Sequence, residues 1–166
     1  ERALHGYALL GLVLLVAQIA LGGWTSANYA ALACPDFPTC QGHWWPPTDF
    51  REAFTLWRGL GVSYEGGVLA SDARMTIHLM HRLGALAVFL YLGWLAWRLM
   101  ATDRSHSVRF AGLAIAGLLA GQLALGIANV VLHLPLPVAV AHNAGAALLL
   151  LALVGLNHLL RPEATA

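Results

Sequence analysis

Four long apolar runs divide the chain, and the polar residues gather between them. The runs cover residues about 4–24, 75–97, 109–132 and 137–160. Each is close to the roughly 20 residues that a helix needs to cross the hydrocarbon core of a bilayer. A helix satisfies its own backbone hydrogen bonds in lipid, whereas the open edges of a sheet stay unpaired there. The pattern predicts an all-α membrane protein in which residues 1–166 form one domain, a bundle of four transmembrane helices.

The longest polar segment, residues about 25–74, contains a helical pattern of its own. Phe50, Phe54 and Trp57 are spaced i, i+4 and i+7, as on one face of a helix. Asp49 is suited to cap the first turn. These residues predict a short amphipathic helix within a long loop. It either lies on the membrane surface, covers the end of the bundle, or only packs as an ordinary loop helix.

Composition agrees with a membrane protein, since 59% of the residues are hydrophobic and only 10% are charged. Soluble domains average about 25% charged residues. The net charge of +1 gives no basic field, so no nucleic-acid partner is expected. The sequence opens with ERALHG rather than a methionine, which indicates a cut inside a longer polypeptide or a processed end.

The arginines indicate how the helices are oriented. Three lie in the segment RLMATDRSHSVRF, which joins the second and third runs, and two flank the bundle: Arg98, Arg104, Arg109, Arg2 and Arg161. Positive residues near the ends of membrane helices favour the cytoplasmic side. Both termini are therefore predicted to be cytoplasmic and the long loop to be outside. The expected location is a bacterial plasma membrane, where lipid surrounds a multi-pass protein.

The first two runs resemble the last two, which predicts a two-helix internal repeat. The first run contains AQIALGGWTSAN and the third GQLALGIAN, which share Gln, Ala-Leu-Gly and a nearby Asn. The second contains HRLGALAVFLYLG and the fourth HNAGAALLLLALVG, which share His followed by Gly-Ala. The shared glutamines, Gln18 and Gln122, are predicted to form interhelical hydrogen bonds. Sites in repeat-built membrane proteins often lie at the repeat interface.

This repeat pairs His81 with His142. At 1.5 Å per residue, each is predicted to lie roughly 8–9 Å below the outer end of its helix. A pseudo-two-fold axis then brings the imidazoles face to face, and Gly84 and Gly145 leave space for a flat cofactor. We expect His81 and His142 to be axial ligands of a six-coordinate haem b, which carries electrons because it has no open position for oxygen. The alternative is two unrelated histidines, each hydrogen-bonded to a neighbouring helix.

Other polar residues accompany the histidine pair. His78 lies one turn before His81. It is an alternative ligand, a contact for a propionate or a second substrate, or a packed histidine; the repeat favours His81 as the ligand. Arg82 and Arg74 lie at the outer end of the second helix, where haem propionates are expected and where an arginine fork pairs with carboxylates. The alternative for Arg74 is snorkelling to lipid headgroups.

Cys34 and Cys40 are the only cysteines, and both lie in the predicted outer loop. Thiols oxidise on that side of a bacterial membrane, so we expect a disulfide between them. It is either redox-active or structural, and a structural role is the simpler expectation.

Three segments together resemble the carboxyl-terminal half of bacterial haem A synthase. They are ALGGWTSANYAALACPDFPTCQGHWWP, IHLMHRLGALAV and QLALGIANVVLHLPLPVAVAHNAGAALLLL, and the similarity runs over nearly the whole chain. Members of that family oxidise the C8 methyl group of haem O to the formyl group of haem A, and they consist of two four-helix halves related by duplication. The resemblance implies that His81 and His142 bind a permanent haem b. It also implies that Cys34 and Cys40 are the paired loop cysteines.

One position departs from the catalytic pattern of that family. The half that holds the substrate haem carries a glutamate three residues before its ligand histidine, where this chain has His78. The resemblance therefore implies an electron-transfer half that is insufficient for catalysis alone, and no catalytic residue is assigned. Its partners would be the other four-helix half, in the same polypeptide or a second subunit, haem O as substrate, and an electron donor such as a quinol. The missing methionine favours an excised half over a half-length member that works as a dimer.

Three other functions are compatible with parts of the sequence. A membrane quinone-linked thiol-disulfide oxidoreductase would use Cys34 and Cys40, but it needs a second cysteine pair or a partner and leaves the histidine repeat unexplained. A non-enzymatic oxidase-assembly subunit predicts a colourless protein. A transporter built from repeats would need discontinuous helices, and no proline interrupts any of the runs.

Overall fold

The computed structural model of the protein describes residues 2–57, 67–101 and 105–161. Its long helices are α1 (Arg2–Ala27), α3 (Ser71–Ala101), α4 (His106–Val131) and α5 (Leu136–Leu159). Each is long and apolar enough to cross a membrane, and the described ranges contain no strand. The predicted all-α fold with four candidate membrane spans is confirmed. Arg104, one of the arginines behind the predicted orientation, lies outside the described ranges.

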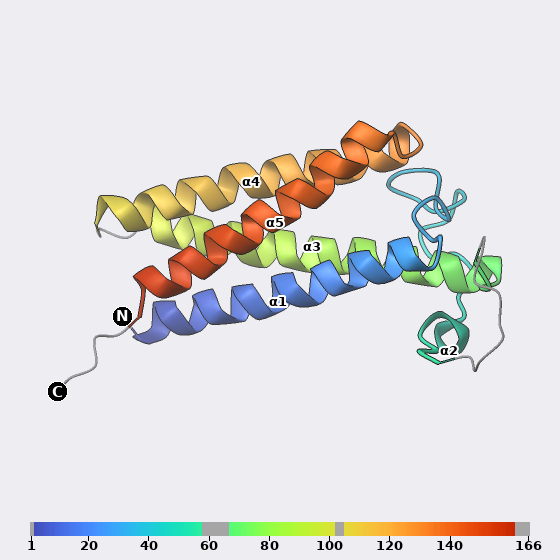
Figure 1. The fold of residues 1–166 in the computed structure, drawn as a ribbon, viewed down its shortest axis with the longest axis horizontal. Coiled ribbons are helices and arrows are strands. Elements are labelled where there is room, and N and C mark those ends of the chain that lie inside the picture. Colours follow the sequence, from blue (N-terminus) through green and yellow to red (C-terminus); the bar gives the residue numbers. More distant parts are fainter. Residues whose placement is uncertain (1, 58–66, 102–104, 162–166) are drawn as a thin grey trace.

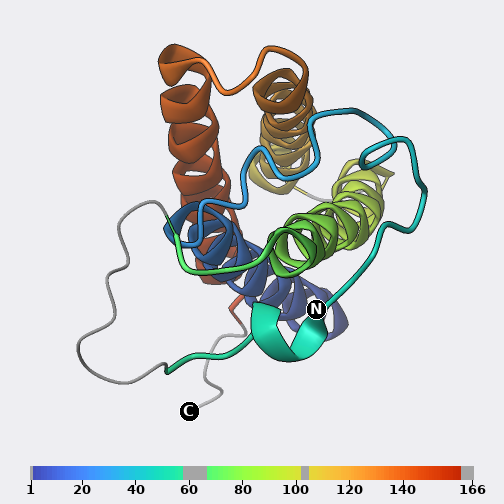
Figure 2. The same ribbon diagram turned by 90° about the vertical axis from the view of Figure 1, so that its right-hand side faces the viewer.

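The four long helices lie side by side in a closed bundle, seen from the side in Figure 1 and from one end in Figure 2. Around the bundle, α1 contacts α3, α3 contacts α4, α4 contacts α5, and α5 contacts α1. We call the end with the long connection between α1 and α3 and the turn between α4 and α5 the loop end. The opposite end, where α1 begins and α5 ends, is the terminal end (Figure 1).

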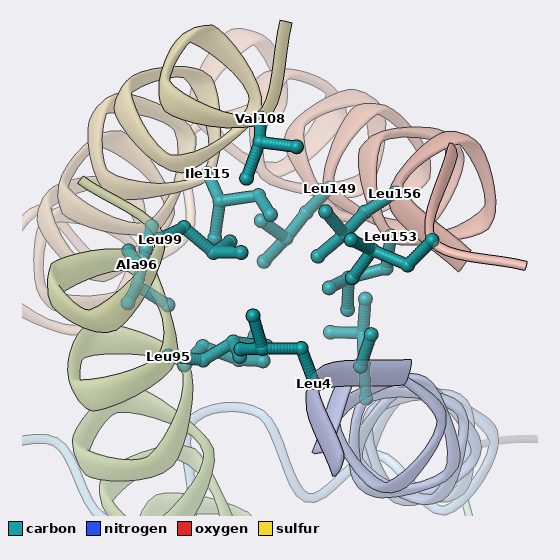
Figure 3. Close-up of a cluster of buried hydrophobic side chains, with 14 of the residues drawn as sticks. Leu4, Leu95, Ala96, Leu99, Val108, Ile115, Leu149, Leu153 and Leu156 are labelled. Atoms are coloured by element: carbon teal, nitrogen blue, oxygen red, sulfur yellow. The ribbon is translucent and has the colours of Figure 1, made fainter. Parts of the chain in front are cut away.

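Buried apolar side chains hold the bundle together in its terminal half. They come from the first half of α1, the second half of α3, the first half of α4 and the second half of α5, and Figure 3 shows them as one cluster. Leu95, Leu99 and Leu153 in this cluster are fully buried. The backbones also come close, since a Cβ added at Gly112 would lie 3.0 Å from the carbonyl oxygen of Ala96. Such close packing is what joins helices in lipid.

The half of the bundle near the loop end has no such apolar filling. Four stretches at this level contain no buried residue: 16–24 of α1, 80–87 of α3, 120–129 of α4 and 136–148 of α5. The helices also diverge here. At the terminal end Asn157 Nδ2 donates a hydrogen bond of 3.1 Å to the carbonyl oxygen of Ala8, whereas toward the loop end α5 moves away from α1 (Figures 1 and 2). Leucine packing therefore does not close this half.

The short helix α2 (Phe50–Ala53) corrects the predicted amphipathic helix. Asp49 caps it as predicted, because its side chain accepts a hydrogen bond of 2.9 Å from the backbone N–H of Glu52. The predicted continuation to Trp57 is wrong. In a longer helix the carbonyl oxygen of Ala53 would accept a hydrogen bond from the Trp57 N–H. It accepts one of 2.9 Å from Trp24 Nε1 instead. Trp57 is 74% exposed, so the predicted apolar face is not continuous.

Helix α3 begins at Ser71, earlier than the predicted residue 75. Its first turns are covered by protein, because Ala73 and Ile77 are fully buried in a cluster that includes residues of the loop after α1 and of α2. This packing allows a polar first turn to extend the helix beyond the apolar run. His81 therefore lies ten residues after the start of α3, whereas His142 lies six residues after the start of α5. The extra residues of α3 belong to the part covered by the loop and α2, so the predicted equal depth of the two histidines in the bundle stays a prediction.

Candidate cofactor-binding site

His81 is held by a glutamine of the neighbouring helix α1. Gln18 Nε2 lies 3.0 Å from Nδ1 of His81 and donates a hydrogen bond of 2.9 Å to the backbone carbonyl oxygen of the same residue. The ring also faces the backbone of α1, since a Cβ added at Gly22 would lie 3.1 Å from Cε1 of His81. A Cβ added at Gly84 would collide with Gln18 Oε1. The two glycines therefore make room for the ring and for the amide that holds it.

His142 has matching surroundings on the other pair of helices. Gln122 Nε2 of α4 lies 3.4 Å from Nε2 of His142. A Cβ added at Gly126 would lie 3.2 Å from Cε1 of His142, and one added at Gly145 would collide with Gln122 Oε1. The same four residue types thus surround each histidine, although Gln18 faces Nδ1 of His81 and Gln122 faces Nε2 of His142. This correspondence supports the two-helix repeat that the sequence predicts.

The two predicted ligands come from opposite helix pairs. His81 lies on α3 and His142 on α5. Both belong to the half of the bundle that buried apolar side chains do not fill. Each helix pair therefore places one imidazole at the level where no cluster of buried apolar side chains fills the bundle.

Several buried polar atoms without partners lie at the same level, and others belong to Arg74 and Asn157. Among the described side chains, Gln122 Oε1, Asn129 Oδ1 and His142 Nδ1 are buried and accept or donate no hydrogen bond. Such atoms are rare in native proteins and point to a missing water, ion or ligand. Imidazole nitrogens ligate haem iron, and bundle cores hold such groups between facing helices. The residues present therefore fit a haem, which His81 and His142 would hold.

His78 makes a different contact, although it lies only one turn from His81. It is 4% exposed, and its Nδ1–H donates a hydrogen bond of 2.9 Å to the carbonyl oxygen of Ala30. This bond joins α3 to the loop that follows α1. The contact agrees with the packed-histidine alternative for His78; because it occupies only Nδ1, the roles of ligand and propionate contact stay predictions.

Arg82 binds the loop that contains the two cysteines. Its guanidinium donates hydrogen bonds to the carbonyl oxygens of Thr39 (2.7 Å), Cys34 (2.9 Å) and Asp36 (2.7 Å). The sulfur atoms of Cys34 and Cys40 are bonded to each other, and both residues are buried. A guanidinium has about five N–H groups, so backbone carbonyls occupy most of the fork that was predicted to face a propionate.

Arg74 lies at the start of α3 beside an open cavity of about 290 Å³, which Tyr29, Gln41 and Ser71 also line. Its Nε atom is buried and, within the described part of the chain, has no hydrogen-bond partner. The guanidinium can therefore still pair with an anion. Both interpretations of Arg74, a propionate contact and snorkelling to a headgroup, stay predictions.

Asp36 shapes the turn between the two cysteines. Its carboxylate accepts hydrogen bonds from the Thr39 hydroxyl and from the backbone N–H groups of Gly42 (3.0 Å) and Gln41. These bonds, with the one from Thr39 the strongest, lower the pKa of the carboxyl from 3.8 to about 2. Because the pKa in the folded state lies below the ordinary value, the bonds stabilise the turn fully above about pH 4. That stabilisation is lost as the pH falls through about 2.

We predict that Asp36→Asn removes this acid-dependent step. Amide hydrogen exchange of Gln41 and Gly42, measured between about pH 2 and 5 and corrected for the intrinsic rate, should accelerate toward low pH only in the wild-type protein. In the variant the exchange should be faster at pH 5 and nearly independent of pH. The same acceleration in both proteins would contradict the assignment of the step to Asp36.

The sequence assigned Gln18 and Gln122 to contacts between helices and missed their contacts with the histidines. A signal was present, because Gln18 and Gly22 have the same spacing as Gln122 and Gly126. Residues four positions apart lie on one helix face. The recurrence of this pair in both repeats, opposite a histidine in each, could have indicated the site.

Four membrane-crossing helices around an internal pair of histidines define a multi-pass membrane protein with a site suited to a bound cofactor. Residues 1–154 match the family described as cytochrome oxidase assembly protein (COX15-CtaA). The chain belongs to this family, and it is a multi-pass bacterial membrane protein.

Curated relatives carry the name heme A synthase. The chain is 50% identical to the protein of that name from Shewanella oneidensis over 153 residues, which are 92% of this chain and 46% of the relative. It is 35% identical to the one from Nitrosospira multiformis over 164 residues, 98% of this chain and 42% of the relative. The heme A synthase COX15 of Arabidopsis thaliana is 29% identical over 140 residues, 84% of this chain and 28% of the relative. The chain thus spans about half the length, or less, of these relatives, and no solved structure matches it significantly.

Proposed function

We propose that this chain is the haem b-binding half of a haem A synthase. It would transfer the electrons that support oxidation of the haem O C8 methyl group to the formyl group of haem A. The observation that carries the proposal is the matched surroundings of His81 and His142, in a half of the bundle without apolar filling. Relatives named heme A synthase support it, each more than twice as long as the segment that this chain matches.

Each helix pair supplies one ligand in this proposal. α3 presents His81 and α5 presents His142, while Gly22 and Gly126 let the neighbouring helices approach the rings. A haem held by two histidines has no open coordination position and supplies one-electron transfer. The loop held by Arg82 covers the same end of the bundle. We place this end outside the cytoplasm and both termini inside.

The oxidation itself is assigned to the other four-helix half. His78 stands where the substrate-binding half of the family has a glutamate, and its Nδ1–H is bonded to a backbone carbonyl group. No carboxylate is therefore available at this position to act on the methyl group. The chain needs a second half, haem O as the substrate of the whole enzyme, and an electron donor, for which a membrane quinol is suited.

The absorption spectrum of the detergent-purified protein tests the proposal. It is recorded for the oxidised protein and again after reduction with dithionite. We expect a narrow low-spin b-type band to sharpen on reduction, with about one haem per chain. A colourless protein, expressed with haem available, would overturn the proposal and favour the oxidase-assembly subunit.

The thiol-disulfide oxidoreductase alternative has less support. Cys34 and Cys40 are 0% and 1% exposed, and disulfide exchange requires a sulfur atom that an attacking thiolate can reach. These are also the only two cysteines in the chain, so it contains no second pair to relay electrons. We therefore propose a structural role for this disulfide.

A further inference from the structure

We propose that Gln18 and Gln122 are positioning residues, which set the ring orientation and the protonated nitrogen of His81 and His142. The inference rests on the proposed haem site and deepens it. Each glutamine contacts an imidazole nitrogen of the neighbouring helix. The glutamines would therefore position the histidine rings in addition to joining the helices.

The contacts of Gln18 determine which nitrogen of His81 carries the proton. A backbone carbonyl oxygen only accepts hydrogen bonds, so the Gln18 atom that lies 2.9 Å from the His81 carbonyl oxygen is its NH2 group. The same NH2 group lies 3.0 Å from Nδ1 of the ring, which is therefore the acceptor. A neutral imidazole has one N–H and one acceptor nitrogen. The proton of His81 is consequently on Nε2.

A glutamine also suits the ring when a metal is bound. A metal takes the lone pair of one ring nitrogen, and the other nitrogen then donates its N–H to a nearby acceptor. For a metal at Nε2 of His81, that donor is Nδ1. Gln18 can supply the acceptor from the same amide by turning Oε1 toward the ring, a change that breaks the bond between its NH2 group and the His81 carbonyl oxygen. Leucine offers neither a donor nor an acceptor, and glutamate offers only acceptors.

Gln122 holds its ring less firmly than Gln18 does. Its Nε2 lies 3.4 Å from Nε2 of His142, whereas Gln18 makes two shorter contacts. Gln122 Oε1 and His142 Nδ1 are both buried and have no partner among the described atoms. We therefore expect substitution of Gln18 to change its histidine more than substitution of Gln122 does.

Nitrogen-15 NMR of the full chain, labelled at histidine and prepared without haem, tests the proposal. The signals of His81 are identified by their loss in His81→Ala. In the wild-type protein they should show a single tautomer with the proton on Nε2, and in Gln18→Leu a mixture of both tautomers. In the haem-loaded protein, Gln18→Glu should shift the reduction potential to a more negative value, because a carboxylate is a stronger acceptor for Nδ1–H.

Asn157→Leu is the matched control. Asn157 is also a buried amide, but it donates to the carbonyl oxygens of Ala8 (3.1 Å) and Leu153 (2.8 Å) at the terminal end. This variant should lose thermal stability and keep both the His81 tautomer and the potential. If Gln18→Leu behaves in the same way, Gln18 only joins helices and the proposal is overturned. A colourless wild-type protein would instead overturn the proposed function, and the NMR result would still decide the role of Gln18.

Discussion

His81→Ala and His142→Ala are each expected to abolish the low-spin b-type spectrum. The two histidines come from opposite helix pairs. Each variant therefore removes one of the two proposed ligands, and the helix pair that carried it no longer binds the metal. Even outer partners of metal ligands contribute roughly 10–100-fold to affinity, so loss of a ligand should reduce haem per chain to below about a tenth. Haem content is measured against protein concentration in detergent, beside the thermal unfolding temperature of each variant.

Two further histidine variants decide whether this loss is specific. His106→Ala changes an exposed residue at the terminal end of α4 and should keep the full haem content. His78→Ala removes the bond to the loop carbonyl and should lower thermal stability while the haem remains bound. Loss of haem in His78→Ala with retention in His81→Ala would make His78 the ligand and contradict the assignment.

Arg82→Ala is expected to release the disulfide loop and to cause the largest loss of stability. Three carbonyl oxygens lose their donor at once: those of Cys34, Asp36 and Thr39. A hydrogen bond to a charged group contributes about 1.5–3 kcal/mol. Because the three bonds share one side chain, we expect a total of roughly 3–5 kcal/mol rather than their sum. Faster amide exchange across residues 34–42 and a lower unfolding temperature are the measurements.

Arg82→Lys and Arg109→Ala are the controls for this loss. Lysine keeps the charge but presents a compact ammonium in place of a planar fork, so Arg82→Lys should be intermediate. Arg109 is exposed at the terminal end, and its substitution should leave the exchange of the loop unchanged. Wild-type exchange rates in Arg82→Ala would show that other contacts hold the loop.

The long apolar runs predicted the four spans. A membrane helix satisfies its backbone hydrogen bonds within the segment, so the length and composition of a run are enough to identify it. The runs could not predict that α3 begins at Ser71, since the polar first turn is stabilised by the loop and by α2 rather than by its own sequence pattern. For the same reason the spacing of Phe50, Phe54 and Trp57 overestimated α2. The carbonyl group that would have continued the helix bonds to Trp24, which lies far away in the sequence.

The histidine pair of the candidate site could be proposed from the sequence because the repeat contains the same pattern twice. His81 and His142 share their register with neighbouring glycines, so two copies of one pattern pointed to the same depth in the bundle. The contacts of Arg82 were not predictable in this way. They depend on where the disulfide loop folds back, and nothing in the local sequence of α3 records that the carbonyl oxygens of Cys34 and Thr39 come within 3 Å of the guanidinium.

The confinement of buried leucines to the terminal half has a consequence for biogenesis. That cluster consists of protein side chains alone, so the four helices can associate as soon as they have entered the membrane. The level around His81 and His142 contains no comparable cluster, and in the proposed function a haem held by the two imidazoles would join the helices there. If the chain binds haem as proposed, insertion into the membrane and haem loading would be separate stages of maturation. The first stage would rest on the leucine cluster, and the second on the two histidines.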